Sequence, residues 1–278
     1  MKNEHLIADP KQRKLRAEQK EALVLVFLRD EIYSSTAVLA IEMGIGERGA
    51  RNVLNRMADK QLLIKDEVKF MANKALPLWG ITSTGIMHNL EPEDVEHISL
   101  RHHKPQRVSP LTIEHTLDVQ RCRQYLLHKV LCKDWIPTRL LPGHNQKRSS
   151  GLRWLAYPDG IVQYPSRKGD YMPVALEIER TRKTPARYVQ IIWGHLENIR
   201  KEHYYRVIYY CQTQKAADSL RALFLRLMPH KGIKRLSIDH GNSYGPEECI
   251  KLFAFSSIEK FDQVKLMKTK PDVVPENP

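Results

Sequence analysis

Apolar and polar positions in the first third of the chain predict three short helices. The near-continuous apolar run Ala22–Leu28 fits a buried strand or a helix, and its charged lead-in over 16–21 favours a helix that ends near Asp30. Ser34 and Ser35 are candidate N-caps for a second helix, Thr36–Met43. After the turn Gly44–Gly46, a third helix is expected over Glu47–Lys60, with Val53, Leu54 and Met57 facing inward.

The outer face of the third predicted helix is basic and amide-rich, and two weakly alternating strand segments follow it at Leu62–Val68 and Leu78–Thr82. Two helices joined by a glycine-containing turn, the second basic, are what docking in the DNA major groove requires. We therefore expect a winged helix-turn-helix DNA-binding domain over residues 20–90; a winged helix that contacts protein or dimerises is the alternative. The expected DNA-binding side chains are Arg48, Arg51, Asn52, Asn55 and Arg56 on the helix, and Lys65, Lys69 and Lys74 near the wing.

Residues 91–110 mix acidic and basic runs with three prolines, which predicts a linker. The charged residues 1–19 and the polar, Pro-containing residues 259–278 are expected to be flexible ends. His97, His102 and His103 lie in the linker. They could bind a metal ion, but a solvated polar stretch is the favoured interpretation.

From residue 111 the pattern becomes mixed α/β and predicts a second domain over 111–258. The expected order is α-β-β-β-α-β-α-β, which makes a mixed sheet with a crossover helix after its third strand. The fold class is therefore α+β. The predicted helices are Thr112–Cys132, Pro185–Lys201 and Lys215–Leu227; the predicted strands are Trp135–Leu141, Leu155–Tyr164, Met172–Arg180, Tyr204–Cys211 and Ile250–Ser256; and Asn145–Gly151 is a basic loop whose Lys147 and Arg148 are further candidates for DNA contact.

The charge balance adds a candidate partner to this picture. Lys and Arg total 45 against 32 Asp and Glu, a net charge of +13. A surplus of this size favours a polyanion, since each neutralised phosphate releases counterions, although a merely soluble basic surface has the same composition. The N-terminus has no apolar signal-peptide core, no apolar stretch is long enough to span a membrane, and the four cysteines lack metal-site spacing, so we expect a cytoplasmic protein.

The segment that carries candidate chemistry runs from Tyr157 to Lys183. Asp159 follows Pro158 at the start of one strand, and a hairpin turn brings back the strand on which Glu177 and Glu179 share a face, with Leu176 and Ile178 facing the core. Three convergent carboxylates would need a cation, and Mg²⁺ or Mn²⁺ prefers such oxygen ligands. Lys183, just past the strand, could orient water or neutralise charge in the transition state. The alternative is a solvated strand face paired with Arg180 and Arg182.

The motif Pro158-Asp159-Gly160, then L-E-I-E around Glu177 and Glu179, then Lys183, resembles the PD-(D/E)xK nuclease fold. With the preceding winged helix and the segment I-E-H-T-L (Ile113–Leu117), the chain more narrowly resembles the replication-relaxation family, which includes the MOB-C class of plasmid-mobilisation relaxases. This resemblance spans roughly residues 20–212. Glu179 stands where the nuclease pattern has lysine, so the lysine role would pass to Lys183.

The resemblance implies a site-specific nick at the transfer origin of a mobilisable plasmid or integrative element. The nick would use metal-activated water and no covalent tyrosine, with metal held by Asp159, Glu177 and Glu179. It also directs attention to Glu114 and His115, and an accessory mobilisation protein and a coupling protein are the implied partners. A helix N-terminus explains Glu114 and His115 as well. Tyr188 is a less favoured nucleophile, because the histidine triad that usually accompanies such a tyrosine is absent.

Two other functions remain open at this point. One is a non-catalytic DNA-binding regulator of replication or transcription on a nuclease-like fold, which Glu179 in place of lysine would fit. The other is a defensive endonuclease of the restriction type, which a neighbouring methyltransferase gene would support.

Overall fold

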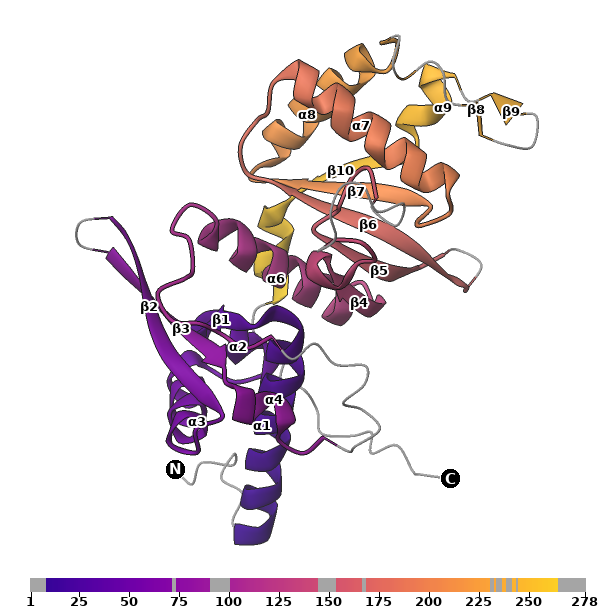
Figure 1. Ribbon diagram of the computed structural model, residues 1–278. Coiled ribbons are helices and arrows are strands. Elements are labelled where there is room, and N and C mark those ends of the chain that lie inside the picture. Colours follow the sequence, from indigo (N-terminus) through magenta and orange to yellow (C-terminus); the bar gives the residue numbers. More distant parts are fainter. Residues whose placement is uncertain are drawn as a thin grey trace. The chain divides into compact units, whose positions relative to one another are not determined.

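The structure is a computed structural model and describes residues 9–71, 74–90, 101–144, 154–166, 169–230, 233, 237–238, 242–243 and 245–264. The chain divides into two compact units (Figure 1). One comprises Met1–Leu117 with Val264–Pro278, and the other comprises Asp118–Gln263. We call them the N-terminal and the C-terminal unit. The division falls inside one helix, just after the predicted linker.

Helices α1, α2 and α3 of the N-terminal unit follow the predicted order but not all of the predicted boundaries. Helix α1 begins at Pro10, so the expectation that residues 1–19 are flexible is wrong from residue 10 onward; residues 1–8 lie outside the described residues. Asp9 starts α1 because its carboxylate accepts the N–H of Lys11, and Pro10 suits a first helical position. The helices are α1 (Pro10–Glu31), α2 (Thr36–Glu42), α3 (Glu47–Asp59) and the short α4 (Ser83–Met87).

A three-stranded antiparallel sheet completes the N-terminal unit. Strand β1 (Tyr33–Ser35) pairs with β3 (Lys74–Ile81), and β3 pairs with β2 (Leu63–Met71), so the order is β1-β3-β2. The two long strands form the expected hairpin, which is longer than the pattern predicted. Apolar side chains from α1, α2, α3 and the sheet make one core, and Trp79 donates its indole N–H to Thr36 inside it.

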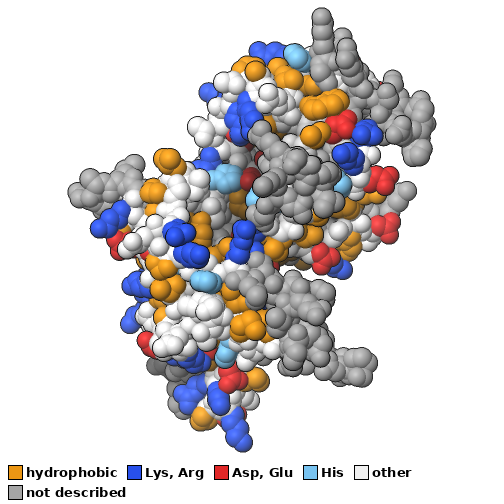
Figure 2. Space-filling view, viewed as in Figure 1, with side chains coloured by type: hydrophobic (Ala, Val, Ile, Leu, Met, Phe, Trp, Pro, Cys, Tyr) orange, Lys and Arg blue, Asp and Glu red, His pale blue; other side chains and the backbone are white. Residues whose placement is uncertain are grey.

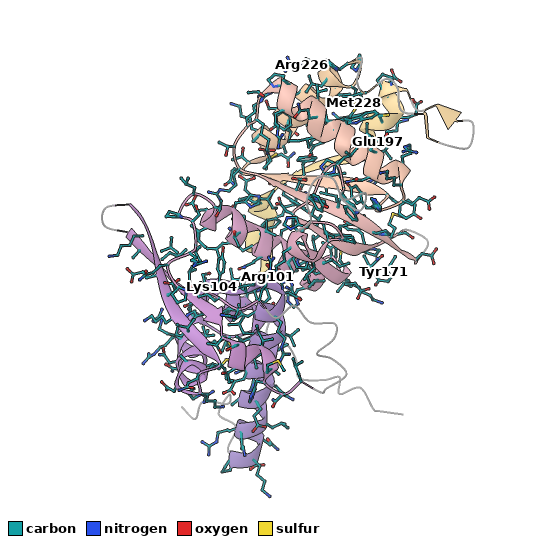
Figure 3. The ribbon with its side chains drawn as sticks, in the orientation of Figure 1. Arg101, Lys104, Tyr171, Glu197, Arg226 and Met228 are labelled. Carbon is teal, nitrogen blue, oxygen red and sulfur yellow. The ribbon has the colours of Figure 1, made fainter. Side chains whose placement is uncertain are left out.

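One histidine of the segment after residue 100 is packed against this sheet, whereas most of its neighbours are exposed. His103 is buried, and its Nε2 lies 2.8 Å from Asp66 Oδ2 on β2. A Cβ added to Gly80 would lie 2.1 Å from His103 Cγ, so the glycine makes room for the imidazole. The expectation of a solvated stretch is therefore wrong for His103, whereas His102 is exposed, as are Arg101 and Lys104, which Figure 3 labels; His97 lies outside the described residues.

The C-terminal unit is built on a five-stranded mixed sheet of order β10-β7-β6-β5-β4. β4, β5 and β6 are antiparallel, whereas β6, β7 and β10 are parallel. The predicted α+β class, mixed sheet and crossover helix after the third strand are present. Its elements are α6 (Ile113–His128, whose first turn belongs to the N-terminal unit), β4 (Lys133–Pro137), η1 (Thr138–Leu140), β5 (Gly160–Pro165), β6 (Tyr171–Glu179), α7 (Pro185–Arg200), β7 (Arg206–Cys211), α8 (Gln214–Leu227), β8 (Ser237–Ile238), β9 (Asn242–Ser243), α9 (Pro246–Ile250), β10 (Phe253–Ser257) and η2 (Ile258–Val264).

Helices cover both faces of the large sheet (Figure 1). Ala175, Val207 and Tyr209 belong to a core with α7 and α8, whereas Leu176 and Ile178 belong to a separate core with α6. Residues that alternate along β6 therefore enter two different apolar layers, as in other sheets covered on both faces. Within the described residues, no helix is long and apolar enough to cross a membrane.

The main departure from the predicted strands lies before β5. The pattern predicted a strand from Leu155, but β5 starts at Gly160. Residues 154–159 form bends instead, because Tyr157 donates its hydroxyl to Pro142 O and accepts the N–H of Trp154. The tail predicted to begin at residue 259 contains the rest of η2. The loop with Lys147 and Arg148 lies outside the described residues.

Candidate active site

Asp159 is held beside β6 by the register of the β5–β6 hairpin. Gly160 pairs with Leu176, and the Asp159 N–H donates to Leu176 O at 2.8 Å, which extends the antiparallel ladder by one residue. The carboxylate turns toward the neighbouring strand, where its Oδ2 accepts the N–H of Ile178 at 2.8 Å. The sheet thus brings Asp159 next to Glu177, as the hairpin predicted.

Glu177 and Glu179 project from the sheet face that α7 and α8 cover. In the parallel ladder they pair with Tyr209 and Cys211, both of which belong to the core on that face. The expectation that the two glutamates share a face is confirmed, and so is the inward position of Leu176 and Ile178 in the opposite layer. However, Glu177 and Glu179 contact different partners, so the two carboxylates do not form one cluster although they share a face.

Glu177 meets a buried histidine that the sequence interpretation missed. His195 of α7 has no exposed surface, and its Nε2 lies 3.1 Å from Glu177 Oε1. Its Nδ1 lies 2.7 Å from the hydroxyl of Tyr204, which also accepts a hydrogen bond from Asn198. His195 follows Tyr188 and Ile192 at helical spacing on the apolar face of α7, so a histidine at an inward helical position was the available signal.

Burial keeps the imidazole neutral. Removal from water lowers the pKa of His195 from 6.5 to about 3, although the negative charge of Asp159 acts in the opposite direction. Burial also raises the pKa of Tyr204 far above its usual value, so its hydroxyl keeps its proton. His195 Nε2 has no hydrogen-bond partner among the described residues, in spite of its short distance to Glu177.

Glu179 is paired with Lys183. Lys183 Nζ lies 2.7 Å from Oε1 and 2.6 Å from Oε2 of the buried carboxylate. The alternative of a solvated face paired with Arg180 and Arg182 does not describe this strand, since Arg180 binds Asp118 of α6 and Arg182 binds Ser219. Lys183 therefore lies directly beside the E-x-E motif, at the end of β6.

Tyr188 is placed poorly for a nucleophile. Its side chain is fully buried, and its hydroxyl accepts the N–H of Lys183 at 3.1 Å. Burial raises the pKa of Tyr188 to about 12, and the negative charge of Glu179 adds to the shift. A tyrosine that attacks phosphorus must be accessible and easily deprotonated, so these properties argue against a covalent role.

A cavity of about 600 Å³ opens beside Glu177 and Lys183. Its aromatic wall contains Trp154, whose ring stacks on that of His203 with centroids 4.3 Å apart. Lys183, Arg187 and Glu177 line the same space. This combination of charges suits an anionic ligand that binds together with a cation. The lining residues are Trp154, Leu155, Ala156, Tyr157, Glu177, Lys183, Arg187, Gln190 and Ile191.

The predicted site residues are thus brought together in part. Asp159, Glu177, Glu179 and Lys183 lie at the same end of β6, but within the described residues no three His, Cys, Asp or Glu side chains lie close enough together to hold a metal ion. His115 lies in the first turn of α6, which belongs to the N-terminal unit, and its role stays a prediction.

The predicted DNA-binding face of α3 is exposed. Val53, Leu54 and Met57 are buried, as the pattern predicted, and the opposite positions are in solvent. Figure 2 shows Lys and Arg side chains on the surface of this unit. Lys65 and Lys69 on β2 are also exposed, whereas nothing is described of the Lys74 side chain. The exposed residues of α3 are Arg48, Arg51, Asn52, Asn55 and Arg56.

Comparison with known proteins identifies no relative of the chain, since neither a family model, nor a curated protein, nor a solved structure matches it. The function is therefore inferred from the sheet register, the buried side-chain pairs and the cavity at the end of β6.

Proposed function

We propose that the chain is a metal-dependent DNA-cleaving enzyme whose active site lies at the carboxyl end of β6. One observation carries the proposal: the β5–β6 register sets Asp159 beside Glu177, and Glu177 and Lys183 line the same cavity. The element order α6-β4-β5-β6-α7-β7, with β6 and β7 parallel, supports a PD-(D/E)xK-like core. The sequence resemblance and the topology thus favour the same reaction class.

The donor set fits a divalent cation in chemistry, since carboxylates are the preferred ligands of Mg²⁺ and Mn²⁺. Asp159 and Glu177 would hold it, while Glu179 already has a cationic partner in Lys183. A bound ion would supply Lewis-acid activation of a phosphate and a more acidic water. The buried His195 beside Glu177 adds a further donor atom at this end of the sheet.

Lys183 and Glu179 act together in this proposal. Glu179 is buried and binds Lys183 through both oxygens, which holds the ammonium group at the cavity wall. From there Lys183 can donate hydrogen bonds to phosphate oxygens as negative charge develops on them. Arg187 on the same wall would bind a neighbouring phosphate of the strand.

The N-terminal unit would supply DNA binding. Its order α1-β1-α2-α3-β2-β3, with an exposed basic α3 and a long hairpin, supports a winged helix that docks α3 in the major groove. On the sequence resemblance to the replication-relaxation family, we propose that the enzyme nicks one strand at the transfer origin of a mobilisable plasmid or integrative element.

A nicking assay tests the reaction. The substrate is a supercoiled plasmid that carries the DNA flanking the gene, incubated with the full chain, Mg²⁺ or Mn²⁺, and the accessory protein of the same element. Open circles are expected with wild type and with Asp134→Asn, an exposed carboxylate on β4 of the same unit. Asp159→Asn should leave the plasmid supercoiled. Equal nicking by Asp159→Asn and wild type would refute the assignment.

A non-catalytic DNA-binding regulator is the second candidate function. The Glu179–Lys183 pair favours it, because this carboxylate needs no metal ion for its neutralisation. It predicts that Asp159→Ala leaves origin binding and replication control in the cell unchanged. Loss of transfer in that variant, with retained DNA binding, would favour the enzyme.

A further inference from the structure

We propose that His195 is a metal ligand and that it shares one divalent cation with Glu177 and Asp159, so that the site prefers a first-row transition ion to Mg²⁺. This inference rests on the proposed function, because it names the ion and the ligands of the same site. In this proposal Glu179 is not a metal ligand; its carboxylate positions Lys183 instead.

His195 and Glu177 approach each other as two ligands of one ion would. Their atoms Nε2 and Oε1 are 3.1 Å apart, yet Nε2 has no hydrogen-bond partner among the described residues. Two donors each about 2.0–2.2 Å from one ion, at a right angle to each other, are about 2.8–3.1 Å apart. Their lone pairs then point at the ion and not at each other. The observed pair has that separation without hydrogen-bond alignment.

The nitrogen without a hydrogen-bond partner is also deeply buried. His195 is wholly buried at the carboxyl end of the sheet, where a polar atom that has lost water and gained no partner destabilises the fold. The proposed ion would give Nε2 a partner. Glu177 keeps partial exposure and lines the cavity, so an ion on this pair remains accessible from it.

Tyr204 and Asn198 support the imidazole from behind. Ligating histidines usually donate the other ring N–H to a fixed acceptor, which orients the ring. Here Nδ1 lies 2.7 Å from the Tyr204 hydroxyl, and Asn198 binds the same oxygen and also Ala156 O. We assign the proton to Nδ1, which leaves the Nε2 lone pair to the ion. Asn198 thereby connects the ligand to the cavity wall at Ala156.

The remaining ligands come from the opposing strand and from solvent. Asp159 lies beside Glu177 across the β5–β6 ladder, with Oδ2 held by the Ile178 amide. Glu179 is occupied by Lys183. An imidazole in place of a third carboxylate changes the selectivity, because nitrogen donors favour first-row transition ions, whereas Mg²⁺ takes oxygen.

Mn²⁺ is the probe for the test, since its binding and its ligands are visible by electron paramagnetic resonance. The full chain is first treated with a chelator and then titrated with Mn²⁺, and pulsed measurements detect coupling to a nitrogen nucleus. We expect one Mn²⁺ per chain, coupled to a ¹⁴N nucleus that becomes ¹⁵N when the protein is produced with ¹⁵N-histidine. A tenfold excess of Mg²⁺ should not displace it.

Three variants tie the nitrogen signal to this site. His195→Gln should lose the coupling and weaken Mn²⁺ binding about tenfold or more. Glu177→Gln should lose both together, and it remains informative if His195→Gln does not fold. His230→Gln, an exposed histidine of the same unit, should match wild type.

The outcomes separate this inference from the proposed function. Tight Mn²⁺ binding without nitrogen coupling would overturn His195 as a ligand and leave the carboxylate site intact. Coupling that survives His195→Gln would overturn it as well. Nitrogen coupling in a protein that nicks no DNA would support His195 as a ligand and refute the nuclease. Absence of stoichiometric binding would contradict both.

Discussion

Lys183 Nζ lies within 2.7 Å of both carboxylate oxygens of Glu179, four residues earlier in the chain. Strand β6 ends at Glu179, and the short connection to α7 turns back far enough for this contact. In the motif E-x-E-x(3)-K the lysine therefore comes from the connection after the strand and still lies at the strand end, whereas in E-x-K it is part of the strand itself.

Removal of this lysine should abolish most of the proposed activity. We expect Lys183→Met to reduce the nicking rate about 100-fold, because a charge-stabilising donor is lost. The rate is measured from the conversion of supercoiled to open-circular plasmid. Lys201→Met, which removes an exposed lysine of the same unit, should nick at the wild-type rate. Full activity of Lys183→Met would assign the lysine to structure alone.

Glu179→Gln tests whether the pair acts as a unit. Without the carboxylate, Lys183 should no longer be held at the cavity wall, so nicking should fall about tenfold or more through loss of orientation. Mn²⁺ affinity, measured by titration, should stay within about twofold of wild type, because Glu179 is not a ligand in the proposed site. A large loss of Mn²⁺ binding would return Glu179 to the metal site.

The basic face of α3 should account for part of the salt dependence of DNA binding. The logarithm of affinity falls with the logarithm of salt concentration by about 0.9 for each phosphate contact. The double variant Arg48→Ala/Arg51→Ala should reduce the slope of log affinity against log salt concentration by about 0.9 for each of the two arginines that contacts a phosphate. Arg226→Ala on α8 serves as the control (Figure 3), since it removes the same kind of charge from the other unit. An unchanged slope in the double variant would remove α3 from the DNA interface.

Gly80 should tolerate no side chain. A Cβ there would overlap the buried His103 ring, so Gly80→Ala should destabilise the N-terminal unit by about 1–3 kcal/mol. Gly49→Ala is the control, because a Cβ at Gly49 inside α3 would meet only Ile45 Cδ1, at an ordinary contact distance of 3.7 Å. Denaturant unfolding of both variants measures the difference. Equal stability would mean that His103 moves away at no cost.

Asp66 should make stability depend on pH below about 4. Burial raises the pKa of Asp66, but hydrogen bonds with the Glu67 amide, His103 and the Gln106 amide outweigh it, and the net pKa lies below 3.8. The charged form is therefore the stabilised one. Its contribution is complete above 3.8, the value of the unfolded chain, and is lost as pH falls through the folded pKa.

The measurement compares unfolding free energies of wild type and Asp66→Asn across that range. The difference should be constant above about pH 5 and should shrink as the solution becomes more acidic. A difference independent of pH from about 5 to about 2 would contradict the assigned direction.

The sequence predicted helix boundaries well where a capping residue and apolar positions at helical spacing were present. Ser35 caps α2 by accepting the Val38 N–H, and Thr184 with Pro185 begins α7, so these boundaries follow from neighbouring residues alone. The hairpin that carries Asp159 and Glu177 was also predictable, because the period of two and one turn determine which side chains lie side by side.

The errors share a different cause. His103 is buried by Asp66, 37 residues earlier, and Tyr157 breaks the predicted strand by contacts with the preceding loop. His195 is not part of a linear sequence motif, because Glu177 and Tyr204 lie in other segments and contact it only in the folded structure. Contacts of this kind are set by tertiary packing, which hydrophobic periodicity along one segment does not contain.

The parallel pairing of β10 with β7 has a consequence for synthesis of the chain. Until Phe253–Ser257 leaves the ribosome, β7 is an edge with unpaired backbone groups, although the proposed catalytic strand β6 is already complete. Such an edge can recruit strands from other nascent copies. A chain that ends between α8 and β10 should therefore aggregate, and pairing of the last strand protects each new chain from others made on the same messenger RNA.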